Sequence, residues 1–94
     1  MTNIKRGQEA VDELYSDPYV IVLKIRYQLN KRGKTQKDLA EMTGIRPNAI
    51  SMLARGYVER LNLDHIERIA AALDITDINE LIELVPRSQV DKYD

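Results

Sequence analysis

The sequence predicts an all-α fold: a compact domain of five helices, preceded by a short N-terminal helical extension. Apolar residues recur at helical spacing in successive segments, and residues typical of helix ends bound each segment. No stretch of β-type alternation competes with these helices. With 94 residues and 44% hydrophobic content, the chain can bury one modest core. We expect the extension at residues 1–17, the domain at 18–86 and a polar tail at 87–94.

The first part of the chain is expected to hold two helices. Residues 7–15 form the short helix of the extension, and a second helix runs from Pro18 to about Lys31, with Asp17 as its cap. The apolar positions of this second helix are Val22, Ile25 and Leu29. Its outward positions are Lys24, Gln28 and Lys31. Gly33 follows as a left-handed terminator.

Two short helices with a glycine-containing turn between them are predicted next. Thr35 and Asp38 resemble a capping box, which predicts a helix from Gln36 to about Thr43, ended by Gly44. Pro47 suits the first position of another helix, which extends to about Ala54. The apolar positions of the two helices are Leu39, Ala40, Met42, Ile50 and Leu53. This pattern over about residues 36–54 is typical of a helix-turn-helix motif.

Two further helices complete the predicted domain. Asn62 is a plausible cap for a helix whose apolar residues lie on one face, namely Ile66, Ile69, Ala70 and Leu73. Thr76 or Asp77 caps the fifth helix, which ends before Pro86. This helix is expected to bury Ile78, Leu81 and Ile82.

Charge is distributed unevenly along the chain, although the net charge is only -1. Residues 24–60 carry nine basic and three acidic side chains, a net charge of +6. Residues 61–94 carry -5 and residues 1–23 carry -2. A basic middle between acidic ends predicts a face that binds a polyanion.

Three blocks of sequence resemble the Cro and lambda-repressor type of helix-turn-helix regulators, the XRE family. They are Lys34–Ile45 with Ala49–Gly56, then Leu63–Leu73, then Ile75–Leu81. The resemblance implies a five-helix domain that binds double-stranded DNA. We expect a homodimer, because one short recognition helix reads few bases. The resemblance further implies a transcription regulator, and we expect a repressor of a bacterial, phage or mobile-element promoter.

In such a domain the third helix enters the major groove with its N-terminal side chains on base edges. The expected base-reading residues are Arg46, Pro47, Asn48, Ala49, Ser51 and Met52. Asn48 could pair with adenine, and Met52 or Ala49 could contact a thymine methyl group. The alternative is that Asn48 supports the first turn and Met52 is merely exposed. Arg46 is unfavourable beside a helix N-terminus, and a phosphate or guanine contact would offset this, unless the side chain is simply solvated.

A second set of residues is expected to contact phosphate, which gives affinity and register without sequence choice. The resemblance assigns Gln36 to this role, and its backbone amide adds a helix-terminus anion site. The full set is Lys34, Thr35, Gln36, Lys37, Arg55, Tyr57 and Arg60. For Lys37 and Arg60 a solvated face is an alternative that the sequence supports nearly as well. Leu29 and Ala54 replace an ion pair common in the family, a double change that the fold tolerates.

Several classes of function are disfavoured. The chain has no cysteine and a single histidine, His65, so a metal site is not expected, and no cofactor is implied. Ser51 has no assigned base, so we expect no catalytic residue and no enzyme activity. The absence of cysteine favours a reducing cytoplasm, and the polar residues 1–10 argue against a signal peptide. No run approaches the roughly 20 apolar residues of a membrane span, so we expect a cytoplasmic protein without a membrane partner.

Other roles remain open from the sequence. The chain could be the antitoxin of a toxin–antitoxin pair with autoregulatory DNA binding, or its fold could serve protein interaction alone. A toxin or an anti-repressor would then be a protein partner. The dimer surface could lie around Leu14 and Tyr15, or around Ile82, Leu84 and Val85.

Overall fold

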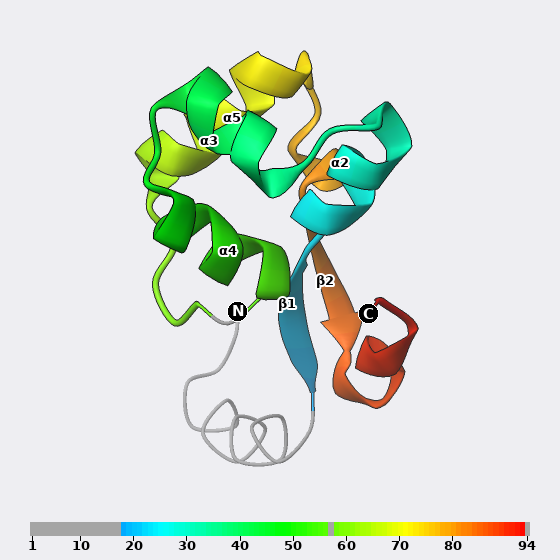
Figure 1. Cartoon of the computed structure of the whole chain (residues 1–94). Helices are drawn as coiled ribbons and strands as arrows, with labels where there is room; N and C mark the ends of the chain where they lie inside the picture. The colour runs from blue at the N-terminus through cyan, green and yellow to red at the C-terminus, as the bar shows by residue number, and fades with distance from the viewer. Residues whose placement is uncertain (1–17, 57, 94) are drawn as a thin grey trace. The chain divides into compact units, whose positions relative to one another are not determined.

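A computed structural model describes residues 18–56 and 58–93 of the chain. Its elements in order are β1 (Tyr19–Leu23), α2 (Ile25–Arg32), α3 (Gln36–Thr43), α4 (Pro47–Arg55), α5 (Leu63–Leu73), η1 (Ile78–Glu80), β2 (Ile82–Pro86) and η2 (Arg87–Tyr93), where η denotes a 3₁₀ helix (Figure 1). The chain divides into two compact units, residues 23–83 and residues 1–22 with 84–94, and each is described by itself. The helix expected over residues 7–15 lies outside the described residues.

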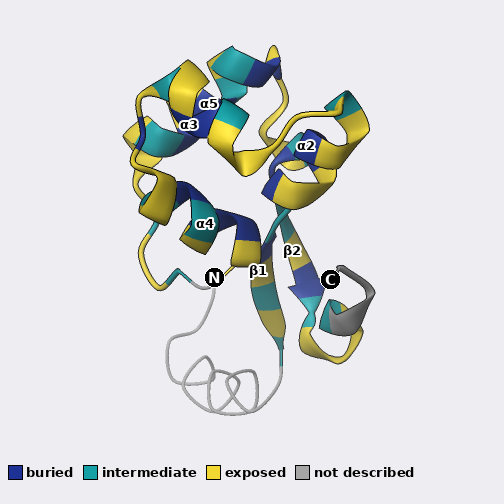
Figure 2. Ribbon diagram, viewed as in Figure 1, coloured by how far each residue is buried: buried dark blue, intermediate teal, exposed yellow. Residues whose placement is uncertain are grey.

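The unit of residues 23–83 is built from helices α2 to α5 around one apolar core. Helix α3 contacts both α4 and α5, and α2 contacts α4. The buried residues of this core are Ile25, Leu29, Leu39, Ala40, Ile45, Ile50, Leu53, Ile66, Ile69, Leu73, Ile75 and Leu81. Figure 2 shows these helices with their buried positions on one side and their exposed positions on the other. One amphipathic face per helix is therefore sufficient to form the core.

The helix boundaries follow from the end residues that the sequence predicts. Thr35 and Asp38 form a capping box at the start of α3, and Pro47 occupies the first turn of α4. The Asn62 side chain accepts a hydrogen bond from the backbone N–H of His65 at the start of α5. Gly44 ends α3 with φ of 75°, a left-handed conformation that glycine adopts without steric cost. The predicted limits of α3, α4 and the start of α5 are confirmed.

The predicted all-α class with five helices is wrong, because the described chain has four α-helices and a two-stranded sheet. The helix expected from Pro18 begins only at Ile25, and a strand precedes it. The run Tyr19–Leu23 is aromatic and β-branched, a composition that favours a strand when a partner is available. The partner is β2, which is distant in the sequence and was assigned to a helix. Pairing with β2 therefore makes this run a strand, although the local spacing of apolar residues fits a helix.

The two strands run antiparallel. The backbone N–H of Lys24 donates to the carbonyl of Leu81 at 2.7 Å, and that of Arg87 donates to Pro18 at 3.2 Å. Both pairs fit a single antiparallel register, in which Ile21 lies opposite Leu84. The side chains of Ile21 and Leu84 are exposed, whereas Val22 and Val85 are buried.

The predicted fifth helix is reduced to the short η1. Its cap is the predicted Asp77, whose Oδ1 accepts from the backbone N–H of Asn79 at 2.9 Å. Leu81 is buried as expected, but Ile78 is 57% exposed and Ile82 belongs to β2. Because β2 pairs with β1 directly after η1, the backbone cannot continue as a helix here.

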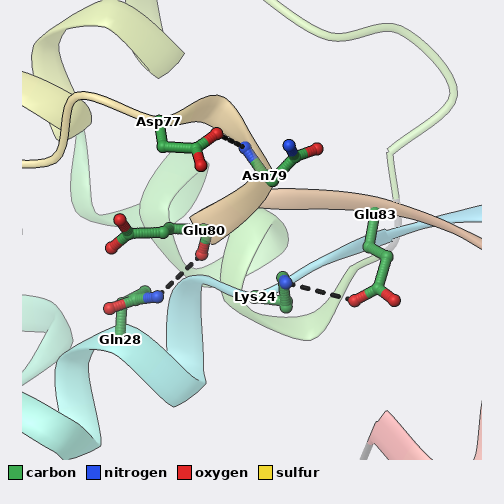
Figure 3. A network of polar contacts seen from close by, with 6 residues as sticks. All are labelled: Lys24, Gln28, Asp77, Asn79, Glu80 and Glu83. Atoms are coloured by element: carbon green, nitrogen blue, oxygen red, sulfur yellow. Dashed lines mark hydrogen bonds and ion pairs between the residues drawn. The ribbon is translucent and has the colours of Figure 1, made fainter.

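Gln28 was predicted to face outward, and this is wrong: its side chain is only 2% exposed. Its Nε2 donates to the carbonyl of Glu80 at 2.8 Å (Figure 3). Its amide oxygen accepts a bond from Arg32. Arg32 also donates from Nε to the carbonyl of Leu73 at 3.2 Å. The amide is buried because both of its polar atoms have partners, which spacing alone does not reveal.

Two more side chains on the predicted helices differ from expectation. Met42 was placed on the apolar face of α3 but is 45% exposed, since Leu39 and Ala40 fill the contact with the core. Lys24 was expected to face outward, but it is half-buried beside Glu83, with 3.1 Å between Nζ and Oε1 (Figure 3). Lys31 is exposed as predicted, with its Nζ 5.7 Å from the centre of the Tyr27 ring.

Candidate nucleic-acid interface

Helix α4 has a buried side and an exposed side. Ile50, Leu53 and Ala54 are buried against the core. Asn48 and Met52 are both exposed, and four positions separate them, so they lie on the same face one turn apart. The helix therefore presents a polar amide and a flexible apolar side chain to solvent.

The other four expected base readers differ in exposure. Arg46 and Pro47 are exposed. Ser51 is half-buried, and half-buried Ala49 packs against the core. A thymine contact is thus sterically easier for Met52 than for Ala49.

The N-terminus of α4 lacks a side-chain cap. Arg46 occupies the cap position in an extended conformation, with φ of -61° and ψ of 140°, and its side chain makes no capping hydrogen bond. Pro47 has no N–H, and the first intrahelical bond runs from the N–H of Ile50 to the carbonyl of Arg46 at 3.1 Å. The N–H groups of Asn48 and Ala49 precede that bond and have no acceptor within the helix. This end of α4 can donate to an anion.

The N-terminus of α3 is closed by its own side chains. The N–H of Asp38 donates to Thr35 Oγ1 at 3.0 Å, and the N–H of Thr35 donates to Asp38 Oδ2 at 2.9 Å. The hydrogen bond from the Thr35 backbone lowers the pKa of Asp38 below the ordinary 3.8, and a hydrogen bond with the Thr35 side chain adds to this effect. The positive charges of Lys34 and Lys37 lower the pKa as well. Gln36 and Lys37 are exposed beside this carboxylate. A phosphate would therefore meet one fixed negative charge among the donors.

The basic residues of the central segment differ in how far they are exposed. Lys24 and Arg32 are engaged within the unit by the bonds described above. The exposed members predicted to contact phosphate are Lys34, Lys37, Arg55 and Arg60. Thr35 and Gln36 are exposed as well, and Tyr57 lies outside the described residues. The structure thus leaves most of the positive charge of residues 34–60 exposed.

Leu29 and Ala54 are both buried, on α2 and α4, which contact each other. The interface between these helices is apolar at these positions. Because both members of the family's common ion pair are replaced by apolar residues, no unpaired charge is buried at these two positions.

Arg68 was assigned no role by the sequence analysis. Its Nη1 donates to the carbonyl of Thr43 at 3.2 Å, and its Nε lies 3.0 Å from Oδ2 of Asp64. This contact joins α5 to the turn between α3 and α4. In the sequence, the spacing of Asp64 and Arg68 four residues apart on a predicted helix indicates their ion pair. It does not indicate the hydrogen bond of Arg68 to the Thr43 carbonyl.

Within residues 18–56 and 58–93, no helix has the length and apolar character needed to cross a membrane. The same residues contain no group of three or more His, Cys, Asp and Glu side chains able to hold a metal ion.

A helix-turn-helix with an exposed face on its second helix defines a small DNA-binding domain, and the comparisons agree. The family of Cro/C1-type HTH DNA-binding domains matches residues 24–87. A solved structure from Bacteroides fragilis, described as a candidate DNA-binding protein, is similar with a TM-score of 0.60 and 26% identity, over 68% of this chain and 100% of that one. No curated protein matches the sequence. The chain belongs to the Cro/C1-type helix-turn-helix family.

Proposed function

We propose that this protein is a sequence-specific transcription regulator, a repressor that binds double-stranded DNA at a bacterial, phage or mobile-element promoter. The observation that carries the proposal is the exposed face of α4, with Asn48 and Met52 one turn apart above a fully buried opposite side. A helix of this kind fits the major groove, where side chains reach base edges. No catalytic step is part of this role.

The residues divide into two functional groups. Asn48 and Met52 read bases, and Arg46 contacts guanine or phosphate beside the open end of α4, where Pro47, Ala49 and Ser51 complete the reading surface. The phosphate group is Lys34, Thr35, Gln36, Lys37, Arg55, Tyr57 and Arg60. Phosphate contacts set the register of α4 and make binding dependent on salt.

The active species is a homodimer, because one short helix reads few bases and two-fold pairing doubles the site. Among the dimer surfaces expected from the sequence, Val85 is buried whereas Leu84 is 60% exposed. We therefore assign Leu84 to the contact with the second copy. In this scheme residues 18–86 form the DNA-binding domain of a cytoplasmic protein, with the extension and the polar tail outside it.

The test is selection of bound duplexes from a random library at two salt concentrations, followed by titration of the selected duplex. A palindromic motif is expected. Asn48→Ala should reduce discrimination at one base pair per half-site by about 1–3 kcal/mol. Gln36→Ala should weaken all duplexes alike and lower the salt dependence by about one phosphate contact. Equal affinities of both variants and the parent for every duplex would reject the assigned interface.

An antitoxin would use the same DNA-binding face. It differs from the regulator because it requires a protein partner. A purified chain that binds its palindrome alone at physiological salt supports the regulator. Binding only after addition of a protein encoded by a neighbouring gene supports the antitoxin.

A further inference from the structure

We propose that Arg68 is a positioning residue for DNA recognition: it fixes the turn between α3 and α4 and thereby the direction of the reading helix. The inference rests on the proposed function, because a positioning effect has meaning only if α4 reads DNA. Arg68 acts through the backbone of Thr43 and is not itself assigned to DNA.

The turn is held mainly by bonds from its own residues. The N–H of Gly44 donates to the carbonyl of Ala40 at 2.9 Å. Thr43 Oγ1 donates to the carbonyl of Leu39 at 2.7 Å and accepts from the N–H of Ile45 at 3.1 Å. Ile45 is buried in the core. These contacts leave the carbonyl of Thr43, at the end of α3, to accept a bond from outside.

Arg68 donates that bond from α5. Nη1 reaches the Thr43 carbonyl at 3.2 Å while Nε pairs with Asp64 at 3.0 Å, so two edges of the planar guanidinium are engaged at once. A cation is favoured at the carbonyl end of a helix, and the last turn of α3 contains no basic residue of its own. A β-carbon at Gly44 would lie 3.8 Å from Nη1, so the guanidinium rests in van der Waals range of the turn. Arg68 therefore links α5 to the end of α3, where the turn that leads into α4 begins.

Two possible roles of Arg68 predict opposite effects of removing the Asp64 carboxylate on DNA binding. If Arg68 positions the turn, loss of the Asp64 carboxylate loosens the guanidinium and weakens DNA binding. If Arg68 instead binds phosphate directly, the same loss releases a cation and strengthens binding. The sign of the effect of Asp64→Asn thus distinguishes the two roles.

The experiment measures affinity for the selected duplex across a salt series, at a temperature well below the unfolding transition of each variant. Arg68→Met should weaken specific binding about three- to tenfold without changing the salt slope. Arg68→Lys should recover part of the loss, because an ammonium can reach the carbonyl but cannot hold both partners. Asp64→Asn should weaken binding relative to Glu67→Gln, which removes an exposed carboxylate on the same helix and reports the general effect of charge.

The matched control for lost positive charge is Arg26→Met, an exposed arginine of α2 outside the proposed interface. Arg68→Met with a lower melting temperature and unchanged affinity would overturn the inference, and so would a salt slope reduced by about one contact. If Arg68→Met fails to fold, the Asp64→Asn and Glu67→Gln pair still decides the sign. Failure of the parent chain to bind any duplex would instead reject the proposed function.

Discussion

The two helices of the helix-turn-helix begin in opposite ways. At α3, Thr35 and Asp38 satisfy each other's N–H groups and place a negative charge at the positive end of the helix. At α4, Arg46 places a positive charge there, its side chain makes no capping bond, and the first turn contains no acidic residue. One helix start is completed from within the chain and the other is left incomplete.

The difference separates stability from recognition within one motif. A capped N-terminus contributes to folding, and its cap occupies some of the N–H groups that could otherwise bind an external anion. An uncapped N-terminus with an adjacent cation costs some stability, and a bound anion can offset that cost. The start of α3 is stabilised by its own side chains, and under the proposed function the start of α4 would be completed by DNA.

The largest expected effect comes from giving α4 a conventional cap. Arg46→Ser should raise the free energy of unfolding by about 0.5–1 kcal/mol, because a hydroxyl replaces a cation at the helix start. The same change should weaken DNA binding about tenfold and lower the salt slope by about one contact. Urea unfolding and fluorescence anisotropy measure the two quantities.

Arg26→Ser, at an exposed position of α2, is the control for loss of charge. A gain in stability with unchanged affinity would mean that Arg46 is only solvated. The comparison between the two helix starts would then have no bearing on recognition.

The limits and exposed positions of the two helices of this motif could be predicted from the sequence. Local signals were sufficient where the structure is local: Thr35 with Asp38, Pro47 and Gly44 each act within a few residues, and the limits of α3 and α4 follow. The exposed positions of Asn48 and Met52 followed from the spacing of Ile50 and Leu53. Whether these residues contact DNA remains a prediction.

The errors concern contacts between residues far apart in the chain. Val22 fits the helical spacing of Ile25 and Leu29, but the run Tyr19–Leu23 also has a β-branched composition. Only pairing with Ile82–Pro86 decides between helix and strand. Gln28 is polar and was placed outside, but the carbonyl of Glu80 makes its burial possible. Arg68 was overlooked for the same reason, since its partner Thr43 lies on another helix.

The next effect is on stability and tests the closed end of α3. Thr35→Val keeps the shape of the side chain but removes the acceptor for the N–H of Asp38, and should lower the free energy of unfolding by about 1 kcal/mol. Thr35→Ser retains the oxygen and should stay close to the parent. Thermal and urea unfolding of the pair provide the measurement, and equal losses in both variants would show that the capping bond does not stabilise α3.

The smallest effect is confined to acid and follows from the lowered pKa of Asp38. Because the folded value lies below the ordinary 3.8, the ionised carboxylate stabilises the fold above that pH, and this contribution is lost as the pH falls through the folded value. Asp38→Asn should therefore be less stable than the parent at pH 5–7, and the difference should shrink below about pH 4.

Urea unfolding from pH 2.5 to 7 can be combined with the double variant Thr35→Val/Asp38→Asn. The two changes should be non-additive at neutral pH, where Thr35 and Asp38 form one capping box, and should approach additivity in acid. A parent-minus-variant difference that stays constant from pH 7 to pH 2.5 would mean that the carboxylate does not contribute its charge to the start of α3. The contrast with α4 would then rest on Arg46 alone.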